Sequence, residues 1–434
     1  MRKRYFLITF AIITIIAGVW VLACKHPTGE GTILGVSTKE NDGNGGNSEP
    51  EIVAYLSQEE QNADFEHEDI LFSGATTPQI PALTVTSREV LIAASGQSAG
   101  NVKIKRSSDL GNTWTDLDFT PDSGYSYPFF INCHNGDILL GVTTATKSAD
   151  SKTIFYRSAN DGETWTKQDS SSVGLKTVCN NATDGYATYG QGITLRHGGN
   201  LGSQKLMFPY FYNAPDNKKN GCYVGIMYSD NNGDSFNSIC ESFYFVKTNA
   251  GNIGSFSSHI SKIIELANGD ILLNMRTSGL NGWTFWMLST NCGKNWDITV
   301  GNSGEENTKN PVWGRNADFI RYEFNGKDIK PTGSQYALMI TSYEKKSGYD
   351  VMLTDNDFNH GQPNGGTAKK YKYTKEIISS STGGYPAITV LPDGTIATLT
   401  EDSGGDMYFK RFNLYWLTGG AENINYSTDT SVKF

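Results

Sequence analysis

The sequence predicts an all-β protein with the architecture of a six-bladed β-propeller. The first observation is a short motif, S-x-D-x-G-x-T-W, which occurs four times with small variations. The second is its spacing, because roughly 50 to 70 residues separate successive copies, which suits four-stranded blades with variable loops. The third is a short apolar run, typical of a strand, directly before each copy. The copies span residues 107–114, 158–165, 229–236 and 289–296.

The chemistry of this motif, the Asp box, explains its residue types. Asp or Asn at the third place can fold its side chain onto nearby backbone N–H groups and hold a turn. Glycine at the fifth place takes a positive φ, and Trp or Phe at the eighth place packs under the hairpin. We expect the boxes to be structural and to face away from the active end of the propeller.

The rest of the chain fits the same ring. Dividing about 370 residues by the mean interval between boxes gives about six blades. A fifth, decayed box is expected at Leu353–Asn356. The last strand, Phe409–Leu417, alternates polar and apolar residues and is expected to close the ring against Ile70–Phe72. Turns followed by buried strands are predicted at residues 135–140, 268–273 and 392–397.

Composition and charge exclude one class of partner. The 434 residues are 38% hydrophobic and 12% aromatic and include 47 glycines, which suits a large core with many tight turns. The net charge is −9, and no basic block occurs beyond the extreme N-terminus, so nucleic acid is not expected as a partner. An acidic ligand would have to be held by a few placed cations.

The N-terminus has the pattern of a targeting segment. Basic residues 2–4 precede an apolar stretch from Tyr5 to Leu22, which is typical of a secretory signal. The Leu-Ala-Cys ending resembles a bacterial lipobox, which would make Cys24 the lipidated first residue of the mature protein. An uncleaved membrane anchor is the alternative. We therefore predict a secreted, membrane-anchored bacterial lipoprotein at the cell surface.

These signals give the predicted domain organisation. It consists of a signal peptide over 1–24, a flexible linker over 25–50, the propeller over 51–420 and a C-terminal tail over 421–434. Five cysteines remain after Cys24, so at least one is unpaired. Cys222 and Cys240 flank the third box, and a disulfide between them is left open. No Cys/His spacing suggests a metal site, so no metal is predicted, and the thiols are expected to be buried apolar residues.

Outside the boxes, three segments resemble the bacterial exo-sialidases and trans-sialidases. They are Gln79–Leu83, Ile263–Arg276 and Gly384–Ile396, the last of which leads on to Leu399–Glu401. The resemblance covers most of residues 65–417. It implies that three arginines hold the carboxylate of sialic acid and that a tyrosine is the nucleophile. It also implies a glutamate that takes the phenolic proton and an aspartate that supplies acid to the leaving group.

Three residues match this pattern. By the resemblance, Tyr385 is the nucleophile, Arg276 is the central arginine, and Glu401 is the glutamate that steadies the first arginine. The structural alternatives are a core tyrosine at a strand start and a surface arginine at a strand end.

The arginine positions depart from the pattern. Gln79 stands in place of the first arginine and can donate hydrogen bonds but brings no charge. The third arginine falls near Lys345 or Lys346, and a lysine keeps the charge but loses the planar fork. Arg315 is a candidate to replace the lost arginine.

The proton-transfer positions depart as well. The glutamate base falls near Ile260 or Ser261, so His259 is the nearest candidate base; a structural histidine is the alternative. The loop that should carry the acid, residues 95–101, contains no Asp or Glu.

The resemblance leads to an exo-α-sialidase without a cofactor that acts on sialylated glycoproteins or glycolipids. In this hypothesis Arg276, Lys346 and Gln79 hold the substrate carboxylate, and Tyr385 attacks the anomeric carbon. One alternative is a non-catalytic propeller that binds sialylated or other acidic glycans, which the missing carboxylates support. Another is a glycosidase for a different sugar, because a fold alone does not fix the substrate.

Overall fold

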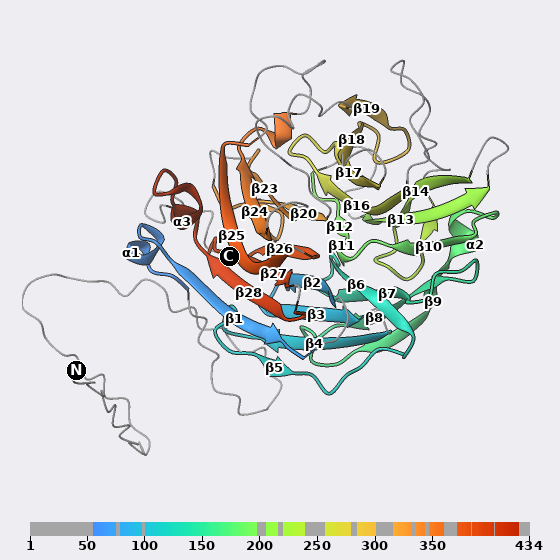
Figure 1. Cartoon of the computed structure of the whole chain (residues 1–434), viewed down its shortest axis with the longest axis horizontal. Coiled ribbons are helices and arrows are strands. Elements are labelled where there is room, and N and C mark those ends of the chain that lie inside the picture. The colour runs from blue at the N-terminus through green and yellow to red at the C-terminus, as the bar shows by residue number, and fades with distance from the viewer. Residues whose placement is uncertain are drawn as a thin grey trace, which may run out of the picture. The chain divides into compact units, whose positions relative to one another are not determined.

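The computed structural model shows six β-sheets arranged around a common axis, which confirms the predicted six-bladed propeller (Figure 1). The structure describes residues 55–74, 79–97, 100–197, 205–215, 220–238, 257–278, 284–300, 316–330, 335–342, 347–359, 371–382, 384–402 and 404–424. All of them belong to one structural unit, residues 35–434. The predictions for residues 1–50, including Cys24, therefore lie outside the described residues.

The blades follow one another along the chain, and the first strands of neighbouring blades contact each other around the axis. Blade 1 contains β2 (Gln79–Val85), β3 (Leu91–Gln97), β4 (Asn101–Ser107) and β5 (Thr115–Asp116). Blade 2 contains β6 (Tyr125–Asn132), β7 (Ile138–Thr144), β8 (Lys152–Ser158), β9 (Thr166–Gly174) and β11 (Gly190–Gln191). Blade 3 contains β10 (Asp184–Ala187), β12 (Ile193–Thr194), β13 (Leu206–Pro215), β14 (Asn220–Ser229) and β15 (Asn237–Ser238).

The last three blades have four strands each. Blade 4 contains β16 (Ser257–Glu265), β17 (Ile271–Ser278), β18 (Thr284–Ser289) and β19 (Asp297–Val300). Blade 5 contains β20 (Ala317–Arg321), β23 (Ala337–Ser342), β24 (Ser347–Thr354) and β25 (Tyr373–Thr382). Blade 6 contains β26 (Pro386–Val390), β27 (Ile396–Glu401), β28 (Met407–Phe412) and β1 (Glu66–Phe72). A short hairpin, β21 (Glu323–Phe324) and β22 (Lys327–Asp328), follows β20.

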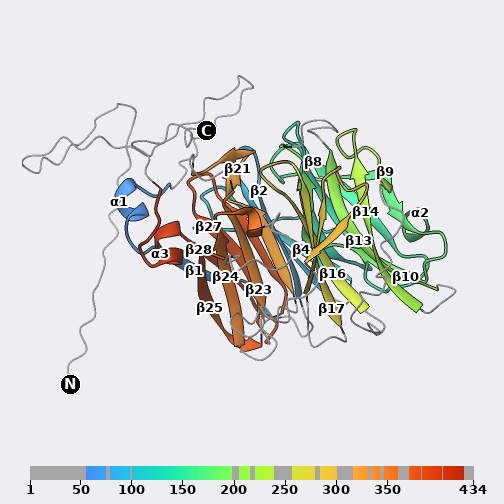
Figure 2. The same ribbon diagram turned by 90° about the horizontal axis from the view of Figure 1, so that it is seen from above.

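The described helices are short. They are α1 (Gln58–Gln61), α2 (Leu175–Val178), α3 (Leu414–Thr418) and the 3-10 turn η2 (Asp357–Asn359). None of these has the length and apolar character that a membrane crossing requires. Figures 1 and 2 both place α1 beside α3 at the edge of blade 6, where the Gln58 side chain donates a hydrogen bond to the carbonyl of Ile424.

The Asp boxes have the predicted hydrogen bonds. In the first box, the Ser107 hydroxyl accepts the N–H of Gly111 at 2.8 Å, and the Asp109 carboxylate accepts the N–H of Thr113 at 2.8 Å. Gly111 has a φ of +92°, and the Trp114 indole donates back to the Gly111 carbonyl at 3.1 Å. The serine-to-glycine bond recurs in the other three boxes.

The decayed fifth box is confirmed and begins at Thr354. Its hydroxyl accepts the N–H of Phe358, the bond that serine accepts from glycine in the other boxes. Phe358 takes the glycine position with a φ of +60°, a backbone conformation that costs free energy for a residue with a Cβ. Burial of its ring against Trp286, with ring centroids 5.5 Å apart, offsets that cost.

The ring is closed by β1, which pairs antiparallel with β28 as predicted. The predicted last strand was too long, however, because β28 ends at Phe412 and residues 414–418 form α3. The cause is Asn413, whose side chain accepts the N–H of Trp416 at 2.8 Å and caps a helix there.

A buried ion pair stabilises the closing seam, which is the region where β1 pairs with β28. Arg411 and Asp393 lie 2.6 Å apart, with side chains 1% and 0% exposed. Arg411 also donates to the Thr395 hydroxyl and to the Leu110 carbonyl, and Asp393 accepts the N–H of Leu56. The pair thus joins blade 6, the first box and the segment before α1.

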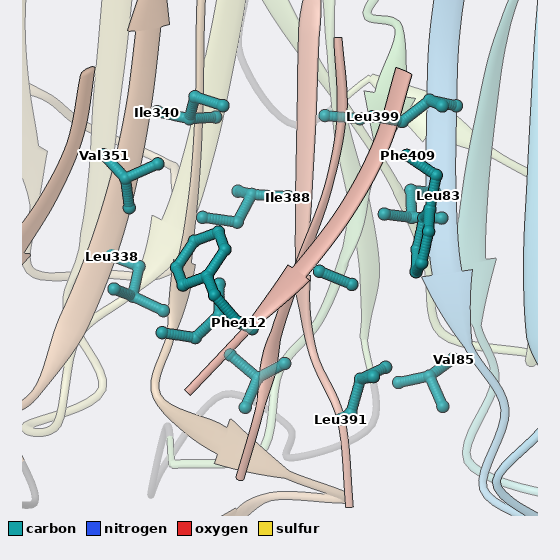
Figure 3. Packing of buried hydrophobic residues seen from close by; sticks show 14 of the residues in the cluster. Leu83, Val85, Leu338, Ile340, Val351, Ile388, Leu391, Leu399, Phe409 and Phe412 are labelled. Atoms are coloured by element: carbon teal, nitrogen blue, oxygen red, sulfur yellow. The ribbon is translucent and has the colours of Figure 1, made fainter. Parts of the chain in front are cut away.

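Apolar side chains from blades 1, 5 and 6 form one continuous cluster behind this seam. Figure 3 shows Leu83 of β2 next to Phe409 of β28, with Ile388 of β26 between them and Val351 of β24. Val85 of β2 belongs to the same cluster. Because all five side chains are buried, the closing strand is held by packing as well as by its ladder of hydrogen bonds.

The cysteine predictions are met in part. Cys133, Cys179 and Cys292 are free thiols, and two of them, Cys133 and Cys292, are buried. Cys240 lies outside the described residues, so the pairing with Cys222 stays a prediction.

We predict that Arg411→Met lowers the free energy of unfolding by about 3 to 5 kcal/mol, because it leaves the Asp393 carboxylate buried without its cation. Chemical denaturation followed by tryptophan fluorescence measures this change. Arg88→Met is the matched control: Arg88 pairs with Asp161 at 3.1 Å but is 50% exposed, so the loss should stay below about 1 kcal/mol. Equal losses in both variants would contradict the role given to Arg411.

Candidate active site

Three of the predicted site residues meet at one end of the propeller axis. Gln79 begins β2, Tyr385 directly precedes β26, and Glu401 ends β27. Since β27 runs antiparallel to β26, its end lies beside the start of β26. The boxes follow the third strand of their blades and therefore lie at the opposite end, as predicted.

Glu401 connects blades 1 and 6 at this end. One carboxylate oxygen accepts the backbone N–H of Gln79, and the other accepts the backbone N–H of Tyr385 at 3.3 Å. The Tyr349 hydroxyl donates to the Glu401 carbonyl and accepts the N–H of Gly384 at 2.8 Å. The start of β2 and the start of β26 are thus both fixed by one side chain.

The Glu401 carboxyl is buried, with 4% of the residue exposed, and no ion pair to it occurs among the described residues. Burial raises the pKa of Glu401 from its ordinary 4.5 to about 7, although the two N–H donors act in the opposite direction. Gly384 makes room for this carboxyl, because a Cβ there would lie 2.0 Å from one of its oxygens.

Gln79 is engaged within the protein. Its side-chain amide donates to the carbonyl of Gly405 and accepts from the hydroxyl of Ser95, and the residue is 1% exposed. The side chain therefore supports the turn between β27 and β28. This placement differs from the predicted direct contact with a substrate carboxylate, because an amide of this length finds both of its partners inside the fold.

Tyr385 is half-buried in a cluster of tyrosines. Its ring meets that of Tyr189 edge to face, with the centroids 5.1 Å apart. Tyr127 belongs to the same cluster, and its ring stacks on Tyr186 at 4.8 Å. Burial, together with the neighbouring Tyr385, raises the pKa of Tyr127 to about 12, so its phenol is neutral at physiological pH.

Tyr127 also has a strained backbone, with a φ of +54°. Strain of this kind in a residue other than glycine often marks a functional site. The sequence analysis missed Tyr127, Tyr186 and Tyr189. The alternation of Tyr125 and Tyr127 at the start of the inner strand β6 was a usable signal for Tyr127, and nothing local distinguished the other two.

Blade 4 contributes the positions of Arg276 and His259. In the ladder between β16 and β17, Ser258 pairs with Thr277 and Ser261 with Met275, with an irregularity between them. This register places residues 259 and 260 opposite Arg276, at the same end of the blade as Tyr385. Lys345, Lys346 and Arg315 lie outside the described residues, so their predicted roles stay predictions.

The predicted acid loop is short in the structure too. The N–H of Gly100 donates to the carbonyl of Gln97 at 2.9 Å, which closes a tight turn between β3 and β4. Among the described residues, no group of three His, Cys, Asp or Glu side chains is arranged to bind a metal.

A polar cavity of about 130 Å³ opens at the other end of the axis. Thr84, Asn132, Arg196, Glu265 and Arg321 are among its lining residues. These stand at the ends of the inner strands, where the boxes are, and neither Tyr385 nor Glu401 lines it. We therefore place the candidate active site at the end of the axis that carries Tyr385 and Glu401, and not at this cavity.

Comparisons with known proteins identify sialidases as similar in sequence and in fold. No protein-family model matches the chain. A curated sialidase from Micromonospora viridifaciens is 25% identical over 385 residues, which are 79% of this chain and 52% of the relative. The chain thus spans about half the length of that relative.

Two solved structures show the same fold. The intramolecular trans-sialidase of Ruminococcus gnavus, in complex with oseltamivir carboxylate, is 15% identical with a TM-score of 0.59; the match covers 81% of this chain and 98% of that one. A sialidase from Streptococcus pneumoniae is 15% identical with a TM-score of 0.56, over 80% and 71% of the two chains.

We predict that Glu401 makes stability depend on pH. Because its folded pKa is raised, the folded state binds the proton more tightly than the unfolded state does. The contribution is fully present below pH 4.5 and is lost as the pH rises through about 7. We expect a loss of about 1 to 3 kcal/mol between these limits.

Denaturation of wild type and Glu401→Gln at pH 5 and pH 8 measures this contribution. The unfolding free energy of the wild type, relative to that of Glu401→Gln, should be higher at pH 5 than at pH 8. The exposed Glu68→Gln control should show no such dependence on pH. A pH-independent effect of Glu401→Gln would show that the carboxyl is ionised throughout.

Proposed function

Because this chain is a divergent homologue of the sialidases, we propose that it is a glycoside hydrolase which removes terminal sialic acids from glycoconjugates. The observation that carries the proposal is the setting of Tyr385. It stands at the start of an inner strand, its N–H is bound by Glu401, and its ring is packed edge to face on Tyr189. A tyrosine held in this way at the mouth of the axis is suited to act as a nucleophile.

The proposed reaction has two steps. The Tyr385 oxygen forms a bond to the anomeric carbon as the glycosidic bond breaks, and the phenolic proton goes to a base while the leaving oxygen takes up a proton. Water then attacks the anomeric carbon, releases the tyrosine and gives free sialic acid with retained configuration. A phenol suits this substrate, because a carboxylate nucleophile would be repelled by the substrate's own carboxylate.

Blade 4 supplies one proposed partner of the substrate carboxylate, Arg276, and the proposed base for the phenol, His259. Arg276 can form a bidentate pair with a carboxylate, and Lys346 would add a point charge. Arg315 is proposed as a further cation. His259, placed opposite Arg276 by the register of β16, is the proposed base, and an imidazole titrates in the right range for that role.

A second candidate function is binding without turnover. It is favoured by the tight turn at Gly100, which leaves no acidic residue between β3 and β4, and by the neutral Gln79. Such a propeller would bind sialylated or other acidic glycans at the cell surface, where lipidation at Cys24 is proposed to anchor it. A glycosidase for a different sugar on this fold is distinguished by its product.

We predict that the purified protein releases sialic acid from a sialoglycoprotein and that Tyr385→Phe lowers the rate at least about 10³-fold, because the nucleophilic oxygen is lost. Free sialic acid, assayed chemically, measures this. Tyr373→Phe, at a half-buried tyrosine on β25, is the matched control and should keep full activity.

Three results would contradict parts of this proposal. Retained turnover in Tyr385→Phe would exclude the tyrosine mechanism. Binding to a sialoglycan surface without release of sialic acid would establish the second candidate. Release of a different sugar would establish the third.

A further inference from the structure

A fully buried ion pair lies on the axis beneath the tyrosine cluster. Lys262 of β16 and Asp318 of β20 are 3.3 Å apart, with side chains 3% and 2% exposed. They come from the inner strands of blades 4 and 5. Neither residue belongs to the matched sialidase positions, and the sequence analysis did not single them out.

The hydrogen bonds of this pair lead toward Tyr385 from two sides. The Lys262 ammonium donates to the carbonyl of Tyr189 and lies 3.8 Å from the centre of that tyrosine's ring. Tyr189 in turn meets Tyr385 edge to face. The Asp318 carboxylate accepts the backbone N–H of Ile388 at 3.2 Å, and Ile388 belongs to β26, the strand that begins directly after Tyr385.

The backbone is shaped to admit the ammonium. Gly190, next to Tyr189, has a φ of +80°, and a Cβ at this position would lie 2.7 Å from the Lys262 nitrogen and 3.3 Å from an Asp318 oxygen. A larger residue is therefore excluded both by its conformation and by the space available.

Stability alone does not account for such a pair. Removing two charges from water costs free energy that their attraction rarely repays, so well-packed apolar residues of similar size are often as stable or more stable. Burial lowers the pKa of Lys262 and raises that of Asp318, which reflects the same cost. A second fully buried pair, Arg411 with Asp393, differs because it bonds Thr395, Leu110 and Leu56 at the closing seam.

We propose that Lys262 and Asp318 are positioning residues that fix the phenol of Tyr385, Lys262 through the ring of Tyr189 and Asp318 through the strand at Ile388. Their importance for turnover rests on the proposed function of Tyr385. The geometric part, that the pair sets the position of this ring, does not.

The test uses the full chain with 3-fluorotyrosine incorporated at position 385 alone, so that one fluorine resonance reports the surroundings of this ring. Lys262→Met with Asp318→Asn removes both charges, while the amide oxygen can still accept the N–H of Ile388. Lys262→Gln with Asp318→Asn is the second charge-free variant, in case the methionine prevents folding, because a glutamine amide can still donate to the carbonyl of Tyr189. Lys330→Met is the matched control, because it removes a lysine paired with Glu422 outside the tyrosine cluster.

We expect the double variant to keep a cooperative melting transition and to show a shifted or split fluorine resonance. For release of sialic acid, kcat should fall about 10- to 100-fold with KM changed less than about twofold, because a small misplacement of a reacting group costs this much. Lys330→Met should alter neither the resonance nor kcat.

An unchanged fluorine resonance in the folded charge-free variant would overturn the proposal, as would a shifted resonance with unchanged kcat. If the wild type releases no sialic acid, the proposed function fails, while the resonance still decides whether the pair positions Tyr385. The two failures are therefore distinguishable.

Discussion

The constraint on which this structure depends is the closure of the ring. A propeller of six separate sheets stays open between its last and first blades unless the two ends of the chain are joined. Here β1, which precedes blade 1 in sequence, pairs with β28 of blade 6 along a ladder from Glu66 to Phe72. Three contributions hold the first and sixth blades together. They are this ladder, the buried Arg411–Asp393 pair and the apolar cluster behind them.

The candidate active site lies on this seam. The N–H of Gln79, from the blade that follows β1, and the N–H of Tyr385, from the last blade, both donate to Glu401. The bond from Gln79 cannot form in an open ring, since about 320 residues separate it from Glu401 in sequence and their loop must close first. The bond from Tyr385 lies within blade 6. The site is therefore assembled by the same event that completes the fold, and damage to the seam should reach the site directly.

Local chemistry decided what could be predicted from the sequence. The Asp boxes could be predicted because each is a turn held by its own residues. This includes the fifth box, in which Thr354 takes the place of serine although Phe358, at a positive φ, takes the place of glycine. The end of the last strand could not be predicted. Alternation of polar and apolar residues continues past Phe412, but Asn413 caps a helix there. Tyr385 and Glu401 were found through resemblance to a family. Lys262 and Asp318 were not found, since they stand on different strands and their side chains meet only where blades 4 and 5 pack together.

The neutral residue at position 79 explains the state of Glu401. An arginine at this position would hold the carboxyl ionised, whereas Gln79 bonds Gly405 and Ser95. Among the described residues, the Glu401 carboxyl then accepts from two backbone N–H groups and no cation. Burial then raises the pKa of Glu401 to about 7. An ionised carboxylate next to Tyr385 would repel an anionic sugar, and a protonated one does not. Loss of the arginine and protonation of the glutamate thus cancel in charge, which suits the acidic substrate that we propose for this end of the propeller at mildly acidic pH.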